Sequence, residues 1–228
     1  ADTAAAGDVR AVKLTGWSEG GHDNCFPDFL PSEILGGEKR LAGGIAKMQA
    51  KGCRAVQYFH FAQMSPNSEF YRRHGEFCAI KSPSGNPFID IFTWPGGGSI
   101  TGMNERMQLI NACPDTAQWH EQILDCVRRG LAWGADAIFL DQTAGAPGSF
   151  LCFDRRHGHR GPAWACGPGK TRLSLAAREL VKAAGDDRAL GAEYVADVIL
   201  QYYDFTIPFG AGTRFGGHHF GEMYRYTF

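Results

Sequence analysis

The sequence has no long uninterrupted run of apolar residues and no tract of basic residues. Of its 228 residues, 23 are Lys or Arg and 24 are Asp or Glu, which gives a net charge of -1 at neutral pH. A near-neutral chain without a basic stripe lacks the electrostatic footprint of a nucleic-acid-binding protein. A chain without about 20 consecutive apolar residues is not expected to cross a membrane as a helix. We therefore expect neither nucleic acid nor a membrane as a partner.

Closely spaced cysteine pairs are also missing. The seven cysteines are scattered and none forms a C-x-x-C pair, so neither a zinc ribbon nor a dithiol redox motif is indicated. This usage favours a reducing compartment, and hence a cytoplasmic location over secretion. The first eight residues lack the basic start and apolar stretch of a signal peptide, and no initiator Met is present. We expect the chain to be part of a longer protein.

The chain is instead rich in glycine, with 30 residues, and in aromatic residues, which make up 12%. Many of the aromatic residues stand in loops that also carry glycine and proline. Aromatic loops on a regular scaffold are typical of a binding cleft, although a single aromatic residue more often anchors its own loop.

One order of elements recurs along the chain: a helical pattern, a glycine, a short apolar run and a polar residue. It occurs at Gly52, Gly134 and Gly185, and it predicts βαβ units with a parallel sheet. Helices are expected over 38–51, 115–134, 171–184 and 195–201, the second capped by Asp115. Strands are expected over 10–17, 53–61, 77–81, 88–94, 135–140, 188–193, 202–207 and 223–228.

This pattern predicts an α/β fold of the (β/α)8 barrel type, with a doubly wound open sheet as the alternative. Only five or six strands are regular, whereas a barrel needs about eight. The stretch between residues 62 and 113 is expected to be a long excursion over the mouth of the sheet. We interpret residues 1–228 as a single catalytic-type domain that is incomplete at one or both ends.

Carboxylates follow two of the expected parallel strands, at Asp141 and Glu193. The carboxyl ends of parallel strands open onto the active site, so these acids are placed for chemistry, although Asp141 alone could equally cap its loop. Two carboxylates from different strands with aromatic residues around them suit glycosidic bond cleavage. Asp and Gln side chains would bind sugar hydroxyls, and aromatic rings would stack on the sugar. The candidate substrate-binding residues are Trp17, His22, Asp23, Phe26, Tyr58, His60, Gln142, His157, His159 and Asp204.

The segment His157-Gly158-His159 has the form of a metal-binding pair, but it has a single intervening residue and no third ligand nearby in the sequence. We therefore interpret these histidines as loop-forming or substrate-binding, and we expect no metal and no cofactor. A metal-dependent hydrolase that uses His22, Asp23, His157 and His159 is a weaker alternative. The segment from Gly167 to Thr171 lacks the full spacing of a phosphate-binding loop.

Several segments carry a resemblance to a known family. They are residues 16–29 (GWSEGGHDNCFPDF), 134–142 (GADAIFLDQ), 152–159 (CFDRRHGH), 190–193 (LGAE) and 220–226 (FGEMYRY). With them the chain resembles a family of bacterial glycoside-hydrolase-like proteins, mostly uncharacterised and distantly related to endo-α-N-acetylgalactosaminidases and to the α-galactosidase and α-glucosidase group.

The resemblance implies a retaining glycosidase that acts on an α-linked oligosaccharide or glycoside. It implies Asp141 as the nucleophile and Glu193 as the acid/base. In the family a small polar residue or glycine follows this glutamate, whereas Tyr194 follows it here. The alternative function is a non-catalytic carbohydrate-binding barrel.

Overall fold

The computed structural model describes residues 1–22, 24–93, 106–143, 151–193 and 195–207. Its centre is a curled sheet of five parallel strands in the order β1-β2-β6-β7-β8. The strands are β1 (Ala11–Leu14), β2 (Arg54–His60), β6 (Ala137–Asp141), β7 (Ala189–Glu193) and β8 (Phe205–Ile207). Their order follows the chain and does not reverse among the described strands, as in the wall of a barrel and unlike a doubly wound sheet.

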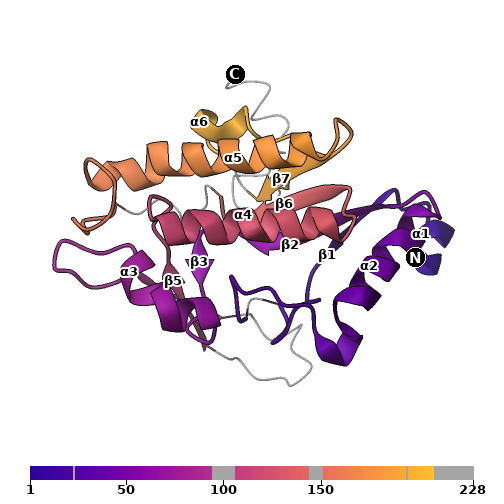
Figure 1. Cartoon of the computed structure of the whole chain (residues 1–228), viewed down its shortest axis with the longest axis horizontal. Coiled ribbons are helices and arrows are strands. Elements are labelled where there is room, and N and C mark those ends of the chain that lie inside the picture. Colours follow the sequence, from indigo (N-terminus) through magenta and orange to yellow (C-terminus); the bar gives the residue numbers. More distant parts are fainter. Residues whose placement is uncertain (23, 94–105, 144–150, 194, 208–228) are drawn as a thin grey trace, which may run out of the picture.

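Helices connect these strands and cover one face of the sheet (Figure 1). The helices are α1 (Asp2–Ala6), α2 (Gly37–Gln49), α3 (Glu76–Cys78), α4 (Ala117–Ala132), α5 (Lys170–Ala183) and α6 (Asp197–Leu200). The long helices α4 and α5 lie side by side. The sequence-based helices are thus confirmed to within a few residues at their ends. No helix in the described segments is long and apolar enough to cross a membrane.

A second sheet is inserted between β2 and α4. Its strands β3 (Gln63–Met64), β5 (Arg106–Asn111) and β4 (Ile89–Thr93) pair antiparallel in the order β3-β5-β4. The sequence predicted β4 but missed β5 and β3. The strand expected over 77–81 is wrong, because its first residues belong to α3 and only Ala79 and Lys81 form isolated bridges. The strand expected over 223–228 lies outside the described residues.

The start of α4 also differs from the expectation. Thr116, not Asp115, occupies the N-cap position of this helix. The carboxylate of Asp115 is buried and forms an ion pair with Arg172 of α5. Asp115 therefore ties two helices together instead of capping one.

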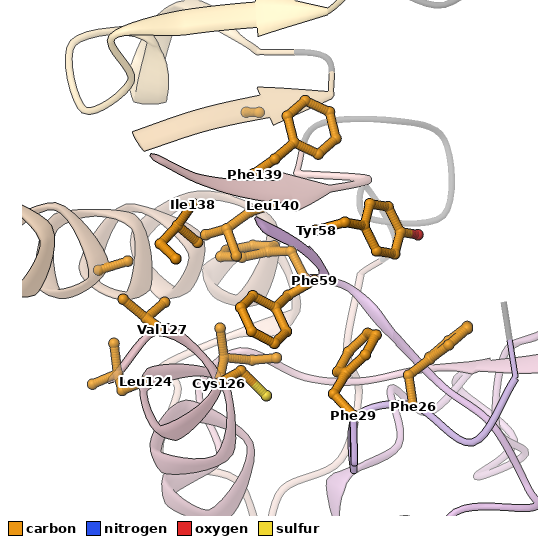
Figure 2. Packing of buried hydrophobic residues seen from close by; sticks show 14 of the residues in the cluster. Phe26, Phe29, Tyr58, Phe59, Leu124, Cys126, Val127, Ile138, Phe139 and Leu140 are labelled. Atoms are coloured by element: carbon orange, nitrogen blue, oxygen red, sulfur yellow. The ribbon is translucent and has the colours of Figure 1, made fainter. Parts of the chain in front are cut away.

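The core lies between α4 and the sheet. Trp119, Ile123 and Val127 recur at helical spacing along α4 and are fully buried. In Figure 2, Ile138 and Leu140 of β6 point toward α4. Strand side chains alternate between the two faces of a sheet. The next residues along each strand therefore point to the opposite face, which we call the inner face.

Glycine at position 130 allows α4 to approach the sheet closely. A Cβ atom there would lie 2.7 Å from the Cδ1 of Ile138 and 2.8 Å from the Cε2 of Phe59, both fully buried residues. Such distances are below van der Waals contact, so an added methyl group would force the helix or the sheet to move.

We expect Gly130→Ala to lower the free energy of unfolding by about 1 kcal/mol, because overpacking costs about 1–3 kcal/mol and the better helix propensity of alanine returns only about 1 kcal/mol. Chemical denaturation measures the change. The control is Gly43→Ala in α2, where an added Cβ atom meets nothing within 4 Å. This control should raise stability by about 0.5–1 kcal/mol, and equal effects of the two substitutions would contradict the close approach.

Candidate active site

The register of the parallel sheet brings the two predicted carboxylates together. His60 of β2 pairs with Asp141 of β6, and Leu140 of β6 pairs with Ala192 of β7. Asp141 and Glu193 therefore end neighbouring strands at the carboxyl edge of the sheet. This edge is where parallel α/β enzymes form their active sites.

Asp141 is held from the β2 side. The Tyr58 hydroxyl donates a hydrogen bond to Asp141 Oδ2 over 2.8 Å, and His60 Nε2 lies 3.9 Å from the same oxygen. The Asp141 side chain is 15% exposed, so one part of its carboxylate remains open to a ligand.

Glu193 contacts the carboxyl group of Asp141 through a hydrogen bond. Burial, together with this contact and the negative charge of Asp141, raises the pKa of Glu193 to about 8, and the positive charge of Lys13 opposes the rise. An acid with this pKa is protonated at neutral pH and loses its proton only as the pH rises through about 8. The pair thus combines a proton donor with a neighbouring carboxylate, which is the division of roles that acid catalysis needs.

The turn after β6 is fastened to Glu193. Gln142 adopts a left-handed backbone conformation with φ of 59°, which is unfavourable for residues other than glycine. Its Nε2 donates to Glu193 Oε2 over 2.9 Å, and the Thr143 hydroxyl donates to the backbone oxygen of Glu193 over 2.9 Å. These hydrogen bonds offset the cost of the turn and fix the position of the Glu193 carboxyl group.

Aromatic and basic groups line the inner face beside the pair. The rings of Tyr58 and Phe139 stack with centroids 6.3 Å apart, and Lys13 Nζ lies 4.4 Å from the centroid of Phe139. The exposed His22 lies with its ring centroid 5.1 Å from that of Tyr58. Lys13 was missed from the sequence, although a single charged residue between apolar neighbours in a strand was the available signal. Asp23 lies outside the described residues.

Two aromatic candidates are corrected by their burial. Trp17 is 7% exposed and packs against the rings of Phe29, Phe59 and Trp133. Phe26 is fully buried, and its ring stacks on that of His60 with centroids 4.6 Å apart. Neither ring presents a free face on which a sugar could stack.

His60 is also largely buried. It is 2% exposed, and its Nδ1 accepts hydrogen bonds from the backbone amides of Ala62 and Gln63. Its position between Phe26 and Asp141 makes it a positioning residue for Asp141.

Asp204 lies at the wrong edge of the sheet for substrate binding. It precedes β8, and its Oδ2 accepts a hydrogen bond from the backbone amide of Leu190 near the start of β7. Its carboxylate forms ion pairs with Arg178 and Lys182 of α5, both at 3.1 Å. Because the strand begins at Phe205, Asp204 stands at its amino end, and its role is to join α5 to the sheet.

His157 and His159 join a different set of side chains. Their nearest chemical partners are Cys113 and Cys152, whereas His22 contacts Tyr58. The described residues of the suggested metal hydrolase site, His22, His157 and His159, are thus divided between two places. His157 is 5% exposed and offers little surface to a substrate.

We expect Asp141→Asn to lower the pKa of Glu193 from about 8 toward the ordinary value, because the substitution removes the neighbouring negative charge while the positive charge of Lys13 continues to oppose the effect of burial. NMR titration of the Glu193 side-chain carboxyl carbon measures the change. Asp8→Asn, at a surface carboxylate 84% exposed, is the matched control and should leave the pKa of Glu193 unchanged. An unchanged pKa in Asp141→Asn would contradict the coupling of the two acids.

Several solved structures have the same fold at low sequence identity. The α-N-acetylgalactosaminidase NagBb from Bifidobacterium bifidum, in complex with GalNAc, matches with a TM-score of 0.68 and 18% identity over 90% of this chain and 30% of that chain. The α-galactosidase TtGalA from Thermus thermophilus, in complex with stachyose, matches with a TM-score of 0.62 and 18% identity over 90% of this chain and 38% of that chain. A family GH13_31 enzyme matches with a TM-score of 0.55 and 15% identity over 81% of this chain and 40% of that chain.

These three chains are glycoside-hydrolase-type proteins, and the present chain spans about a third of their length. At such identity the likeness establishes the fold. No curated protein sequence matches the chain. The model of one protein family matches residues 3–213, and the chain therefore belongs to the family described as domain of unknown function DUF6259.

Proposed function

We propose that the protein is a glycoside hydrolase that cleaves an O-glycosidic bond by a retaining mechanism. The observation that carries this proposal is the contact between Asp141 and Glu193 at the carboxyl edge of the sheet, with the pKa of Glu193 raised to about 8. A two-carboxylate glycosidase uses a pair of acids of this kind, of which one is protonated at neutral pH.

The hydrogen bonds support a different role for each acid. Asp141 accepts a hydrogen bond from the Tyr58 hydroxyl, which fixes the orientation of its carboxyl group. Glu193 carries the proton and is held by Gln142. Asp141 is therefore the nucleophile and Glu193 is the general acid.

The reaction proceeds in two steps. Glu193 donates its proton to the oxygen of the leaving group while Asp141 attacks the anomeric carbon and forms a glycosyl-enzyme. Glu193, now ionised, takes a proton from water, and the resulting attack on the anomeric carbon releases the sugar and restores Asp141.

The spacing of the acids supports retention over inversion. Retaining enzymes hold the two carboxyl groups about 5–5.5 Å apart, and inverting enzymes hold them about 6.5–9.5 Å apart to admit a water molecule. Asp141 and Glu193 end adjacent strands and their carboxyl groups contact one another directly, which suits the closer spacing of a retaining pair. A bound glycoside would replace this contact and separate the groups to the retaining distance.

The structural relatives and the inner face support a proposal for the substrate class. The structural relatives include an α-N-acetylgalactosaminidase and an α-galactosidase, which supports an α-linked galactoside or N-acetylgalactosaminide as substrate here. His22, Gln142 and Lys13 stand beside the carboxylates as hydroxyl-binding groups. The described strands would form five of the eight in a (β/α)8 barrel within a longer protein.

A second candidate function is carbohydrate binding without turnover. The observation that favours it is the same contact, because the two acids must separate before an anomeric carbon can lie between them. The two functions differ in one measurement, since a binding-only protein would retain a glycoside without releasing an aglycone.

We expect Asp141→Asn to reduce kcat/KM by roughly 10³-fold or more, because the substitution removes the nucleophile. Glu193→Gln should reduce it by about 10²–10⁴-fold with an unactivated leaving group. Release of nitrophenol from aryl α-N-acetylgalactosaminides and α-galactosides by the full-length protein measures both. Asp8→Asn is the matched control. Undiminished turnover by Asp141→Asn would refute the assignment, and glycoside binding without turnover by the unsubstituted protein would establish the binding-only function.

The pH profile provides a separate check. Because Glu193 must be protonated to act as the acid, kcat/KM should decline as the pH rises through about 8. In Glu193→Gln, assayed with an activated leaving group, this alkaline limb should disappear. An alkaline limb that persists in Glu193→Gln would show that another group supplies the proton.

A further inference from the structure

Four metal-binding side chains meet outside the candidate active site. They are Cys113, Cys152, His157 and His159, and their ligand atoms all lie within 4.8 Å of one another. Both cysteines are fully buried, His157 is 5% exposed, and only His159 reaches the surface. The four residues come from two parts of the chain, the end of the inserted sheet and the segment 151–161 that follows β6.

The hydrogen bonds of His157 match those of a metal ligand. Its Nε2 lies 2.6 Å from the backbone oxygen of Phe77 and donates to it, while its Nδ1 lies 3.3 Å from the Sγ of Cys152. Histidines that bind metals usually donate their second ring nitrogen to a backbone carbonyl or carboxylate, which fixes the ring and the tautomer. Nδ1 of His157 is thus left facing the two sulfur atoms as an electron-pair donor.

His159 supplies a second, independent observation. Its Nε2 is buried and has no hydrogen-bond partner in the described part of the chain. Its ring is perpendicular to that of His157, at 89° with centroids 5.5 Å apart. Buried polar atoms are normally satisfied, because an unpaired one costs about 1–3 kcal/mol. A metal ion at the centre of the cluster would satisfy this nitrogen.

The backbone holds the ligands in place by its own hydrogen bonds. The amide of Cys113 donates to the oxygen of Cys78 over 2.8 Å, and the amide of Cys152 donates to the oxygen of Pro162 over 2.9 Å. The Asp154 carboxylate accepts from the amide of Arg156 over 2.9 Å and so shapes the turn that leads to His157. Backbone hydrogen bonds therefore fix the positions of the segments that carry the four side chains.

We propose that Cys113, Cys152, His157 and His159 bind one structural zinc ion. Two sulfur and two imidazole ligands in a tetrahedral arrangement are the donor set that selects zinc. With bonds of about 2.0–2.3 Å, a tetrahedral site has ligand-to-ligand distances of roughly 3.3–3.8 Å, so the widest separation in the cluster has to close by about 1 Å. Two thiolates neutralise the charge of the ion, which suits a buried position.

All four positions of a tetrahedral ion are occupied by protein side chains, so the site is closed to water and substrate. Closed sites of this kind stabilise structure, whereas catalytic zinc keeps an open position. The ion would join the inserted sheet to the segment after β6, a stretch that contains turns and little regular structure. This role is independent of the glycosidase proposal.

The test is metal analysis of the full-length protein purified under reducing conditions and reconstituted with zinc. We expect one equivalent of zinc per chain, and with cobalt in its place we expect the visible absorption of a tetrahedral thiolate complex. His159→Ala and Cys152→Ser should each lose the bound equivalent and lower Tm. The matched controls His74→Ala and Cys25→Ser, at residues outside the cluster, should keep it.

His159→Ala is the decisive variant because His159 is the partly exposed ligand and its loss is the least disruptive to folding. The cobalt spectrum of the unsubstituted protein remains informative where a variant does not fold. Three results would each overturn the proposal. The first is absence of metal after reconstitution, and the second is metal retained by His159→Ala. The third is a disulfide between Cys113 and Cys152, found by mass spectrometry in the freshly purified, unreduced protein. Asp141→Asn should keep the zinc, so failure of the glycosidase proposal is distinguishable from failure of this one.

Discussion

The hydrogen bond between the carboxyl groups of Asp141 and Glu193 is the contact on which the candidate site depends. Two like-charged groups cannot lie side by side in a partly buried place unless one of them keeps a proton. The strand register enforces the contact, since both residues end neighbouring parallel strands. The positions at which β6 and β7 end therefore bring Asp141 beside Glu193 and raise the pKa of Glu193.

The surrounding aromatic residues serve this contact in two ways. On the helix side of the sheet, Trp17 and Phe59 form a rigid packed layer with their neighbours. On the inner face, Tyr58 reaches Asp141 directly and Phe139 supports Lys13. Side-chain alternation along β2 thus places Phe59 in the packed core and Tyr58 beside Asp141.

The sequence was most informative where a pattern is local. The apolar spacing of α4 and the glycine before β6 predicted both elements, and the acidic residues at the ends of β6 and β7 predicted the carboxylate pair. Burial was harder to foresee, because Trp17 at the end of an expected strand and Phe26 in a loop-like sequence both fill the core. Contacts between segments that follow no regular pattern could not be foreseen, and Cys113 therefore gave no sign of the histidines at 157 and 159.

The inserted sheet has a consequence for how the protein folds. β2 and β6 are neighbours in space, but the whole of β3, β4, β5 and α4 lies between them in the chain. Closing such a long loop costs conformational entropy before the strand pairing can offset that cost. Contacts between residues far apart in the sequence therefore slow folding. Pairing of β2 with β6 therefore closes a loop that contains an entire second sheet. The insertion thus makes the pairing of His60 with Asp141 a contact of long sequence separation.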